Sequence, residues 1–248
     1  AHDLDAAPLS VSGPTEVMRA AAAFNFMQQR LRRLVVERGR ALAAVSHDLR
    51  TPLTRMRLRA ELVDDAALQA KLNADIDAMQ GMVDSVLSYL RGIEDAEPVQ
   101  PINIEALVSS IVEDERALGR QVRLEGVAPG PQMPAPYAGK LSILKRAVTN
   151  LIDNAVAHGK NVTVRIEDSA ACLRVIIEDD GPGIPQGDLT RVTEPFVRLD
   201  ASRRLDTGGV GLGLAIVRDA AAYHGGTVVL ENRRSGGLRA ILQLPRAR

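Results

Sequence analysis

The chain has 248 residues, of which 46% are hydrophobic and 25% charged, a composition typical of a globular protein and not of a disordered one. Lysine plus arginine and aspartate plus glutamate each number 31, so the formal net charge is zero and overall charge does not favour nucleic-acid binding. The single Cys172 excludes an internal disulfide framework and cysteine-rich zinc sites. No apolar run approaches the roughly 18 residues that span a bilayer and no signal peptide opens the sequence, so we expect a soluble piece of something longer.

The first part of the chain follows heptad spacing, which is typical of a coiled coil. After a polar connector, the proline and glutamate within 14–16 favour a helix start. Apolar residues then recur every seven positions through 17–34, and again through 35–63 with an offset of four. The inserted four is a stutter, which together with Gly39 predicts a soft joint within 31–40; the alternative is an imperfect repeat without a role.

A second helix with complete heptads is predicted over 68–90. The connection over 63–67 is short, so the two helices should form an antiparallel hairpin. One hairpin is too thin to bury both apolar stripes, which predicts dimerisation into a four-helix bundle. Glycine, acidic residues and two prolines make 92–102 the best linker in the chain.

The remainder mixes strands and helices. Asn103 is placed to cap a helix over 104–118, and Gly159 closes a long amphipathic helix over 138–158. The other predicted elements are strands over 121–127, 162–167 and 173–179, a loop-dominated stretch to Gly209, a helix over 211–224, and a final hairpin of strands over 227–232 and 238–244. This pattern predicts an α/β layer with one sheet and helices on a single face.

His47 is the first candidate for chemistry. Since Leu42 and Leu49 occupy core positions of the heptads, His47 is predicted on the opposite, water-facing side, with Thr51 one turn later on the same face. A neutral imidazole has a ring nitrogen free to attack, and the adjacent Asp48 is able to accept the other ring proton. Pro52 removes a backbone hydrogen bond and favours a kink.

Two glycine-rich segments and an asparagine pair predict a phosphate site. Residues 179–184 follow a strand and 209–214 open a helix, where glycines allow close backbone approach and the helix N-terminus offers free N–H groups. Asn150 and Asn154 lie four apart on one helix face, and such amide oxygens suit a hydrated Mg²⁺ that bridges phosphates. The absence of Gly-Lys-Ser/Thr excludes a P-loop, and the context of 209–214 disfavours a dinucleotide fold.

These motifs together resemble the sensor histidine kinases of two-component systems, most of all the EnvZ-like type. The resemblance covers essentially the whole chain. Ser46 to Leu53 is similar to the H-box, Asn150 to Ala155 to the N-box, Asp179 to Ile184 to the G1 box, Glu194 to Phe196 to the F-box, Gly209 to Leu214 to the G2 box, and residues 14–36 to the second helix of a HAMP linker.

The resemblance implies an α+β multidomain fold: a helical hairpin that forms a dimeric four-helix bundle, followed by an α/β sandwich of the histidine kinase/Hsp90/gyrase type. The implied domains are a partial HAMP linker over 1–36, a dimerisation and phosphotransfer hairpin over 37–95, and an ATP-binding catalytic domain over 96–248. HAMP helix one, the sensor and the membrane segments have no counterpart in this sequence. The parent protein is then expected in a bacterial inner membrane, with this portion cytoplasmic.

The resemblance also implies residue roles. His47 would be the phosphoacceptor, Asp48 its proton-accepting helper, and Thr51 would position a water that dephosphorylates the partner. Asn154, supported by Asn150, would bind Mg²⁺, and Asp179 would bind the adenine amino group. The remaining implied contacts to ATP are Gly181, Gly183, Ile184, Gly209, Gly211, Leu212 and Gly213 around the pocket, Phe196 as anchor of the lid, and Arg198 and Arg203 at the γ-phosphate.

The implied activity is ATP-dependent autophosphorylation of His47, then transfer to an aspartate of a response regulator, with a regulator phosphatase activity besides. The implied partners are a second copy of the chain and an OmpR-like receiver domain, and no nucleic acid. Two alternatives stay open. An ATPase of the same nucleotide fold would release phosphate without labelling His47, and a scaffold with a decayed pocket would bind no nucleotide.

Overall fold

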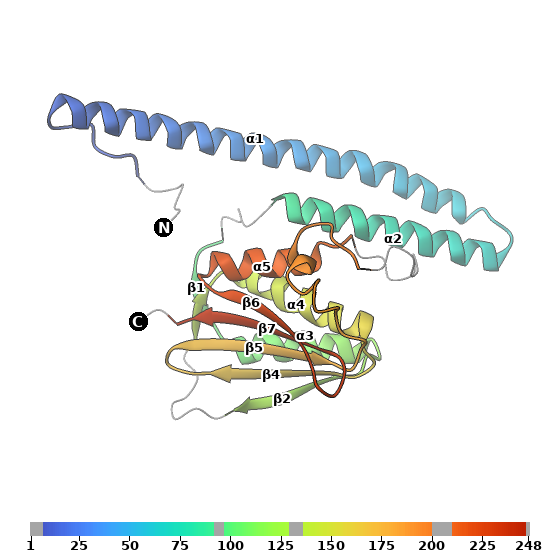
Figure 1. The fold of residues 1–248 in the computed structure, drawn as a ribbon. Coiled ribbons are helices and arrows are strands. Elements are labelled where there is room, and N and C mark those ends of the chain that lie inside the picture. Colours follow the sequence, from blue (N-terminus) through green and yellow to red (C-terminus); the bar gives the residue numbers. More distant parts are fainter. Residues whose placement is uncertain (1–6, 92–96, 129–135, 200–209, 247–248) are drawn as a thin grey trace. The chain divides into compact units, whose positions relative to one another are not determined.

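The computed structural model describes residues 7–91, 97–128, 136–199 and 210–246. Within those ranges the side chains of some helix and strand residues, among them His47, lie outside the description. The chain divides into two compact units, residues 1–91 and 92–248, each of which folds around its own contacts. The first unit is a pair of long helices, and the second combines helices with strands (Figure 1).

The first unit consists of α1 (Thr15–Ala60) and α2 (Ala66–Arg91) in an antiparallel hairpin. Helix α1 begins directly after Pro14 and runs without interruption across the predicted joint at 31–40, so the heptad offset does not break the helix. The connection lies over 61–65, two residues earlier than predicted. Asp65 ends this connection, and its carboxylate accepts hydrogen bonds from the backbone N–H groups of Ala67 and Leu68 in the first turn of α2.

The hairpin buries only part of its apolar surface. Ion pairs link the two helices at Arg50–Asp84 (2.8 Å) and Arg57–Asp77. Between the helices lie the buried side chains of Leu53, Ala60, Ile76 and Leu87. A second set of apolar side chains on the two helices remains 40–47% exposed: Val45, Leu49, Met56 and Met79. A single chain therefore leaves an apolar stripe uncovered.

The second unit contains two sheets, where the sequence predicts one. Its elements are β1 (Gln100–Ile102), α3 (Ile104–Ala117), β2 (Val122–Ala128), β3 (Tyr137–Gly139), α4 (Leu141–His158), β4 (Val162–Asp168), β5 (Cys172–Asp179), a short 3-10 helix (Arg191–Thr193), α5 (Gly213–Tyr223), β6 (Thr227–Asn232) and β7 (Leu238–Pro245). The main sheet has the order β2-β4-β5-β7-β6, with one parallel pair, β2 and β4, and otherwise antiparallel neighbours.

The small sheet corrects two predicted boundaries. Strand β1 pairs with β3, so the last three residues of the predicted linker are a strand and not a connector. For the same reason α4 begins at Leu141 and not at 138, because 137–139 belong to β3. Glu97 also reaches this region, and its carboxylate accepts a hydrogen bond of 2.9 Å from the Ser142 backbone N–H. Hydrogen bonds from the Ser142 side chain, and then from its backbone N–H, lower the pKa of Glu97. The backbone contact also satisfies an N–H group that has no partner within the first turn of α4.

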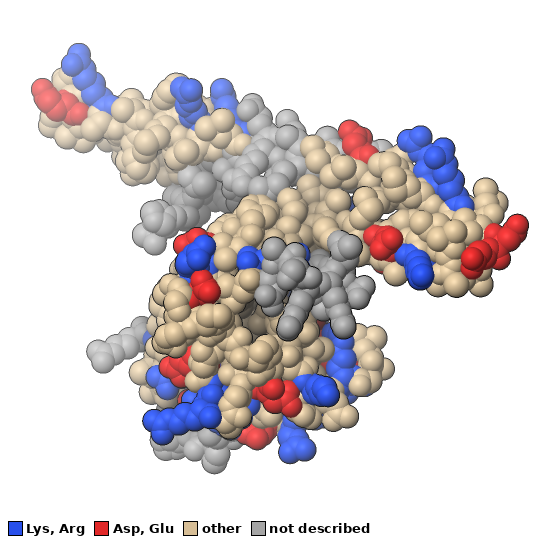
Figure 2. Space-filling model, turned by 45° about the vertical axis from the view of Figure 1, so that its right-hand side comes forward, with Lys and Arg blue, Asp and Glu red and all other residues tan. Residues whose placement is uncertain are grey.

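The helices α3, α4 and α5 cover one face of the main sheet, as predicted (Figure 1). The core between these layers is aliphatic, with Leu144, Leu151 and Ile152 of α4 packed against strand residues such as Val164 and Ile177. Asn103 caps α3 through a hydrogen bond of 3.0 Å from the Ala106 backbone N–H. The opposite face of the sheet carries a hollow of about 390 Å³ lined by charged and aliphatic side chains. Basic and acidic residues are interleaved over the side of the unit in Figure 2.

Candidate nucleotide-binding site

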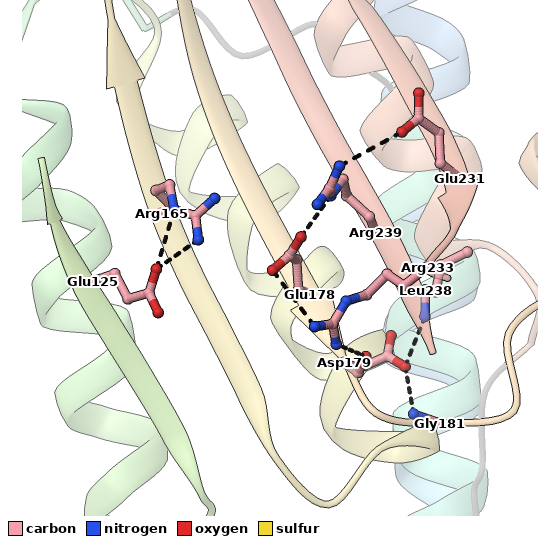
Figure 3. A network of polar contacts seen from close by, with 9 residues as sticks. All are labelled: Glu125, Arg165, Glu178, Asp179, Gly181, Glu231, Arg233, Leu238 and Arg239. Atoms are coloured by element: carbon pink, nitrogen blue, oxygen red, sulfur yellow. Dashed lines mark hydrogen bonds and ion pairs between the residues drawn. The ribbon is translucent and has the colours of Figure 1, made fainter. Parts of the chain in front are cut away.

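Asp179 ends strand β5 and is 3% exposed. Its Oδ1 accepts two backbone hydrogen bonds, from Gly181 at 2.8 Å and from Leu238 at 3.2 Å (Figure 3). No hydrogen bond to Oδ2 occurs within the part of the chain that the structure describes. Since one oxygen is held by the backbone, the carboxylate keeps a fixed orientation and its second oxygen remains able to accept a hydrogen bond from a ligand.

The loop after β5 needs its glycines. A Cβ atom at Gly181 would lie 2.6 Å from the backbone oxygen of His158, at the end of α4. Gly183 has a φ of +73°, and a Cβ there would lie 2.6 Å from the Asn232 side chain. Asn232 instead exchanges two hydrogen bonds with the backbone of Ile184, at 2.8 Å and 2.6 Å. The loop therefore rests directly against α4 on one side and against the end of β6 on the other.

Asp180 joins this loop to the turn that follows α4. Its carboxylate accepts hydrogen bonds from the backbone N–H groups of Asn161 (3.0 Å) and Lys160 (2.7 Å) and from the Asn161 side-chain amide (2.6 Å). These donors, the Asn161 backbone first, lower the pKa of the Asp180 carboxyl to about 2. The charged carboxylate thus fixes the loop next to Asp179 across the whole physiological pH range.

The two asparagines lie one turn apart on α4, and Asn150 lies against the start of α5. Asn150 is half-buried, and its amide nitrogen donates a hydrogen bond of 2.7 Å to the backbone oxygen of Arg146. Its Oδ1 lies next to Gly213, where an added Cβ atom would be only 3.1 Å away. Asn154 is half-buried one turn further, and within the described ranges no hydrogen bond engages its side chain. A carboxamide oxygen in that state fits a hard cation such as Mg²⁺, which takes oxygen ligands and is bound through few protein groups.

The start of α5 is the second glycine-rich element. Gly211 has a φ of +74°, and a Cβ there would lie 2.8 Å from the backbone oxygen of Val197. Phe196 donates its backbone N–H to the Gly211 oxygen at 2.9 Å and has itself a φ of +65°, which is rare outside glycine. Such backbone strain is concentrated at functional sites. Leu212, in contrast, is 2% exposed and packs into the interior.

The structure therefore brings most of the predicted site residues together in the second unit. Gly213 lies against Asn150, Gly211 against Phe196, and Asp179 against Gly181. Arg198 is exposed, and its side chain lies near Gly211. Arg203 and Gly209 lie outside the described residues. The sequence analysis missed Asn232, Arg233 and Leu238, which hold the loop and Asp179 from the β6–β7 hairpin and carry no motif of their own.

In the first unit, the predicted phosphoacceptor region lies within α1. His47 is helical, but its side chain is outside the described residues. Thr51 has an exposed side chain, so the face predicted to be accessible to solvent is accessible at that position, and the neighbouring Asp48 is exposed as well. Leu49, predicted at a core position, is 40% exposed in the single chain, while Leu53 is buried in the hairpin.

Two family models match the chain. Residues 37–96 match the His Kinase A (phospho-acceptor) domain, and residues 139–248 match the histidine kinase-, DNA gyrase B- and HSP90-like ATPase. The first match contains His47, and the second contains Asn150, Asn154, Asp179 and both glycine-rich segments. The two matches fall on either side of the division between the compact units, apart from a few residues.

Curated relatives agree with these domains. The chain is 41% identical over 240 residues to the sensor histidine kinase GtrS of Pseudomonas aeruginosa, a match that covers 97% of this chain and 49% of the relative. It is 34% identical over 239 residues to the sensor protein RstB of Escherichia coli, covering 92% of this chain and 53% of the relative. The chain thus spans about half the length of the curated relatives it matches.

Among solved structures, full-length ShkA in complex with AMPPNP has a TM-score of 0.66 and 25% identity, covering 84% of this chain and 46% of that one. Within the described ranges, the helices contain no stretch with the length and apolar character of a membrane span. The paired helices with a phospho-acceptor match, the ATPase fold and the relatives agree: the chain belongs to the sensor histidine kinases of two-component systems.

Proposed function

We propose that this chain is an ATP-dependent protein-histidine autokinase that phosphorylates His47. The observation that supports this most strongly is the Asp179 carboxylate, one oxygen of which is held by two backbone N–H groups while the other is available to the adenine amino group. The glycine loop, the asparagine pair and the start of α5 belong to the same compact unit. The same chain carries a phospho-acceptor domain with His47, so donor site and acceptor lie in one polypeptide.

The proposed reaction is a phosphoryl transfer. A ring nitrogen of His47 attacks the γ-phosphorus of ATP, the bond from that phosphorus to the β–γ bridging oxygen breaks, and ADP leaves with the electron pair. The proton of the other ring nitrogen passes to Asp48, which neutralises the imidazolium that forms. Because a loose transition state needs little covalent assistance, the ATPase unit acts by positioning and by neutralising charge.

Asn154, supported by Asn150, is the proposed holder of Mg²⁺, which supplies positive charge to the phosphate oxygens when bound. Gly181, Gly183 and Ile184 would shape the pocket, and Gly209, Gly211 and Gly213 would bring backbone N–H groups of the α5 start to the phosphates. Phe196 is the proposed anchor of the lid over the nucleotide. Arg198 and Arg203 would contact the γ-phosphate.

The uncovered stripe of the hairpin supports a homodimeric four-helix bundle. Val45, Leu49, Met56 and Met79 lie on the surface of one chain, and full burial of a side chain of this kind contributes about 1.5–3 kcal/mol. A second hairpin supplies the matching apolar surface, which gives a bundle of four helices. We propose residues 37–95 as this domain, 1–36 as a partial HAMP linker and 96–248 as the catalytic domain.

The proposed partner is a response regulator of the OmpR-like type, which docks on the bundle near His47 and takes the phosphoryl group onto an aspartate. The exposed Thr51, one turn from His47, would position a water that hydrolyses the aspartyl phosphate of the regulator. The chain would then also act as a regulator phosphatase. We place the full-length parent in a bacterial inner membrane, with this portion on the cytoplasmic side.

The test uses the whole chain and ATP labelled at the γ-phosphate. His47→Gln should bind ADP as tightly as the unchanged chain and incorporate no label. Asn154→Ala should abolish labelling that depends on Mg²⁺. The bound label should be lost in acid and kept in base, as a phosphoramidate is. Label that remains on His47→Gln would contradict the proposal, and steady phosphate release without label would favour an ATPase that performs conformational work.

A further inference from the structure

The β6–β7 hairpin holds the backbone of Asp179 through one guanidinium group. Backbone pairing of β5 with β7 ends at Glu178 and Arg239, one residue before Asp179. Asp179 is 3% exposed. Its carbonyl has no partner in β7 and accepts a hydrogen bond of 2.7 Å from Nη1 of Arg233. A buried carbonyl at the end of a ladder needs such a partner. Arg233 therefore replaces the missing strand contact at the position that carries the proposed adenine ligand.

Arg233 is itself held by a charge network that begins on the opposite face of the sheet. Side chains alternate along a strand, so Glu178 points away from Asp179. Glu178 is 9% exposed, lies 3.9 Å from Arg233 and accepts a hydrogen bond of 2.5 Å from Arg239, which lies 4.0 Å from Glu231 (Figure 3). The Arg233 side chain is 28% exposed. Its guanidinium group is held through both terminal nitrogens, with Nη2 near the Glu178 carboxylate and Nη1 on the Asp179 carbonyl.

The backbone of Asp179 decides where its carboxylate points. Oδ1 accepts hydrogen bonds from the backbone N–H groups of Gly181, in the loop after β5, and of Leu238, at the start of β7. The end of β5 must therefore stay close to both segments. Gly237 lies so close that a Cβ there would be 1.9 Å from the Asp179 carbonyl oxygen, so the hairpin and the strand end are in backbone contact. A small rotation of the Asp179 peptide would turn the second carboxylate oxygen away from a ligand, because a hydrogen bond weakens steeply as its angle closes.

We propose that Arg233 is a positioning residue for base selection: by holding the Asp179 carbonyl, it aims the carboxylate at the 6-amino group of adenine. This inference rests on the proposed function of Asp179 as the adenine ligand. Arg233 touches neither the nucleotide phosphates nor the reacting atoms in this assignment. Its removal should therefore lower discrimination between bases and leave the affinity for the rest of the nucleotide largely unchanged.

The experiment compares two ligands on the whole chain by calorimetry: ADP and purine riboside 5′-diphosphate, which lacks only the 6-amino group. The unchanged chain should bind ADP at least about tenfold more tightly, as expected for a hydrogen bond to a charged group. In Arg233→Met this ratio should fall to about threefold or less. The matched control is Arg165→Met, which breaks another ion pair, with Glu125, without contact to Asp179. Its ratio should equal that of the unchanged chain.

The ratio separates positioning from stability, because a general weakening of the fold affects both ligands equally. If Arg233→Met weakens both ligands and keeps the ratio, the proposal is overturned. If Arg233→Met does not fold, Arg233→Gln, which is too short to span the same contact, is held to the same ratio. An unchanged chain that does not distinguish the two ligands would overturn the adenine role of Asp179 and this proposal with it. A ratio lost in Asp179→Asn but kept in the Arg233 variants would overturn the role of Arg233 alone.

Discussion

The two units of this chain solve the problem of burying apolar surface in different ways. The ATPase unit places side chains such as Leu151, Leu173 and Leu242 at 1% exposure or less, between a sheet and three helices of the same chain. The hairpin leaves Met56 and Met79 each 46% exposed. A layered unit completes its core alone, whereas two helices have too few neighbours to cover a heptad stripe on both sides.

This difference matches the proposed division of labour. A self-sufficient core holds the nucleotide site rigidly, because Asp179 and its glycine loop are fixed by strands and by α4. A hairpin that needs a second copy couples the phosphoacceptor to assembly. Changes in the ATPase unit should therefore affect stability and nucleotide binding, and changes in the stripe should affect association.

The largest expected effect is on the stability of the ATPase unit. Gly237→Ala places a Cβ 1.9 Å from the Asp179 carbonyl oxygen and should lower the free energy of unfolding by about 3 kcal/mol or more. Gly236→Ala is the control, since its φ of +90° is equally unusual but nothing lies within 4 Å of the added atom. We expect a cost of about 1–2 kcal/mol there. Denaturant unfolding measures the stability of both variants. Equal losses of unfolding free energy would show that Gly237 does not lie close to the Asp179 carbonyl.

Next is nucleotide affinity. Asp179→Asn keeps an oxygen for the Gly181 and Leu238 N–H groups but loses the charged acceptor, so ADP binding should weaken about 10- to 100-fold. Asp180→Asn, one residue later, should have a much smaller effect, because that carboxylate bonds the 160–161 turn. Calorimetry gives the affinities and sedimentation the association state, which should not change. If Asp179→Asn dissociated the dimer, the idea that nucleotide binding and dimerisation belong to different units would be wrong.

The association of the hairpin should respond to the stripe. Met56→Lys puts a charge on the surface that a second copy is expected to cover, and should raise the dimer dissociation constant at least about tenfold. Leu58→Lys is the control, since Leu58 is 58% exposed and lies two residues away, on another side of α1. Sedimentation equilibrium measures both variants. A dimer that tolerates Met56→Lys as well as Leu58→Lys would place the interface elsewhere.

The smallest effect concerns pH. Nε2 of His224 accepts the Lys140 backbone N–H at 3.3 Å and Nδ1 lies 2.9 Å from the Ala220 carbonyl oxygen, so the ring is held neutral. Burial, and then the charge of Lys140, lower the pKa of His224 below 6.5, against the opposing Ala220 carbonyl. The folded state thus binds fewer protons than the unfolded state, and stability is full above pH 6.5 and declines as pH falls below it.

His224→Gln should flatten this decline, because the group with the lowered pKa is then gone. Thermal unfolding of the chain between about pH 7.5 and 5 records the slope. The same slope in His224→Gln as in the unchanged chain would mean that the ring near Tyr137 and Tyr223 does not control it.

Much of the fold was predictable because local patterns determined it. The heptads predicted both long helices, and runs of strand-forming residues predicted β4, β5, β6 and β7 to within about one residue. The strands β1 and β3 were missed because each is three residues long and exists only through pairing with the other. The soft joint within 31–40 stays a prediction, because a stutter changes which face is apolar and breaks no backbone hydrogen bond, so it is compatible with the continuous helix α1.

The candidate site was predictable where chemistry requires a residue type. Glycines at positive φ, paired amides and a carboxylate at a strand end are visible in the sequence at Gly183, Asn150 and Asp179. Arg233 and Asn232 were not predictable, because an arginine or asparagine in a hairpin is usually solvated. Leu212 shows the opposite case: it belongs to a glycine-rich motif but packs into the core.

The amino-acid sequence by itself determined the two-part organisation, the helical hairpin and the chemical groups of the nucleotide site, because these follow from periodicity and from residue types with few substitutes. Only the tertiary structure decided which apolar stripe stays uncovered and which side chains hold Asp179 in place. Burial and long-range hydrogen bonds depend on segments far apart in the chain, such as Asp179 and Arg233, whose approach no local pattern encodes.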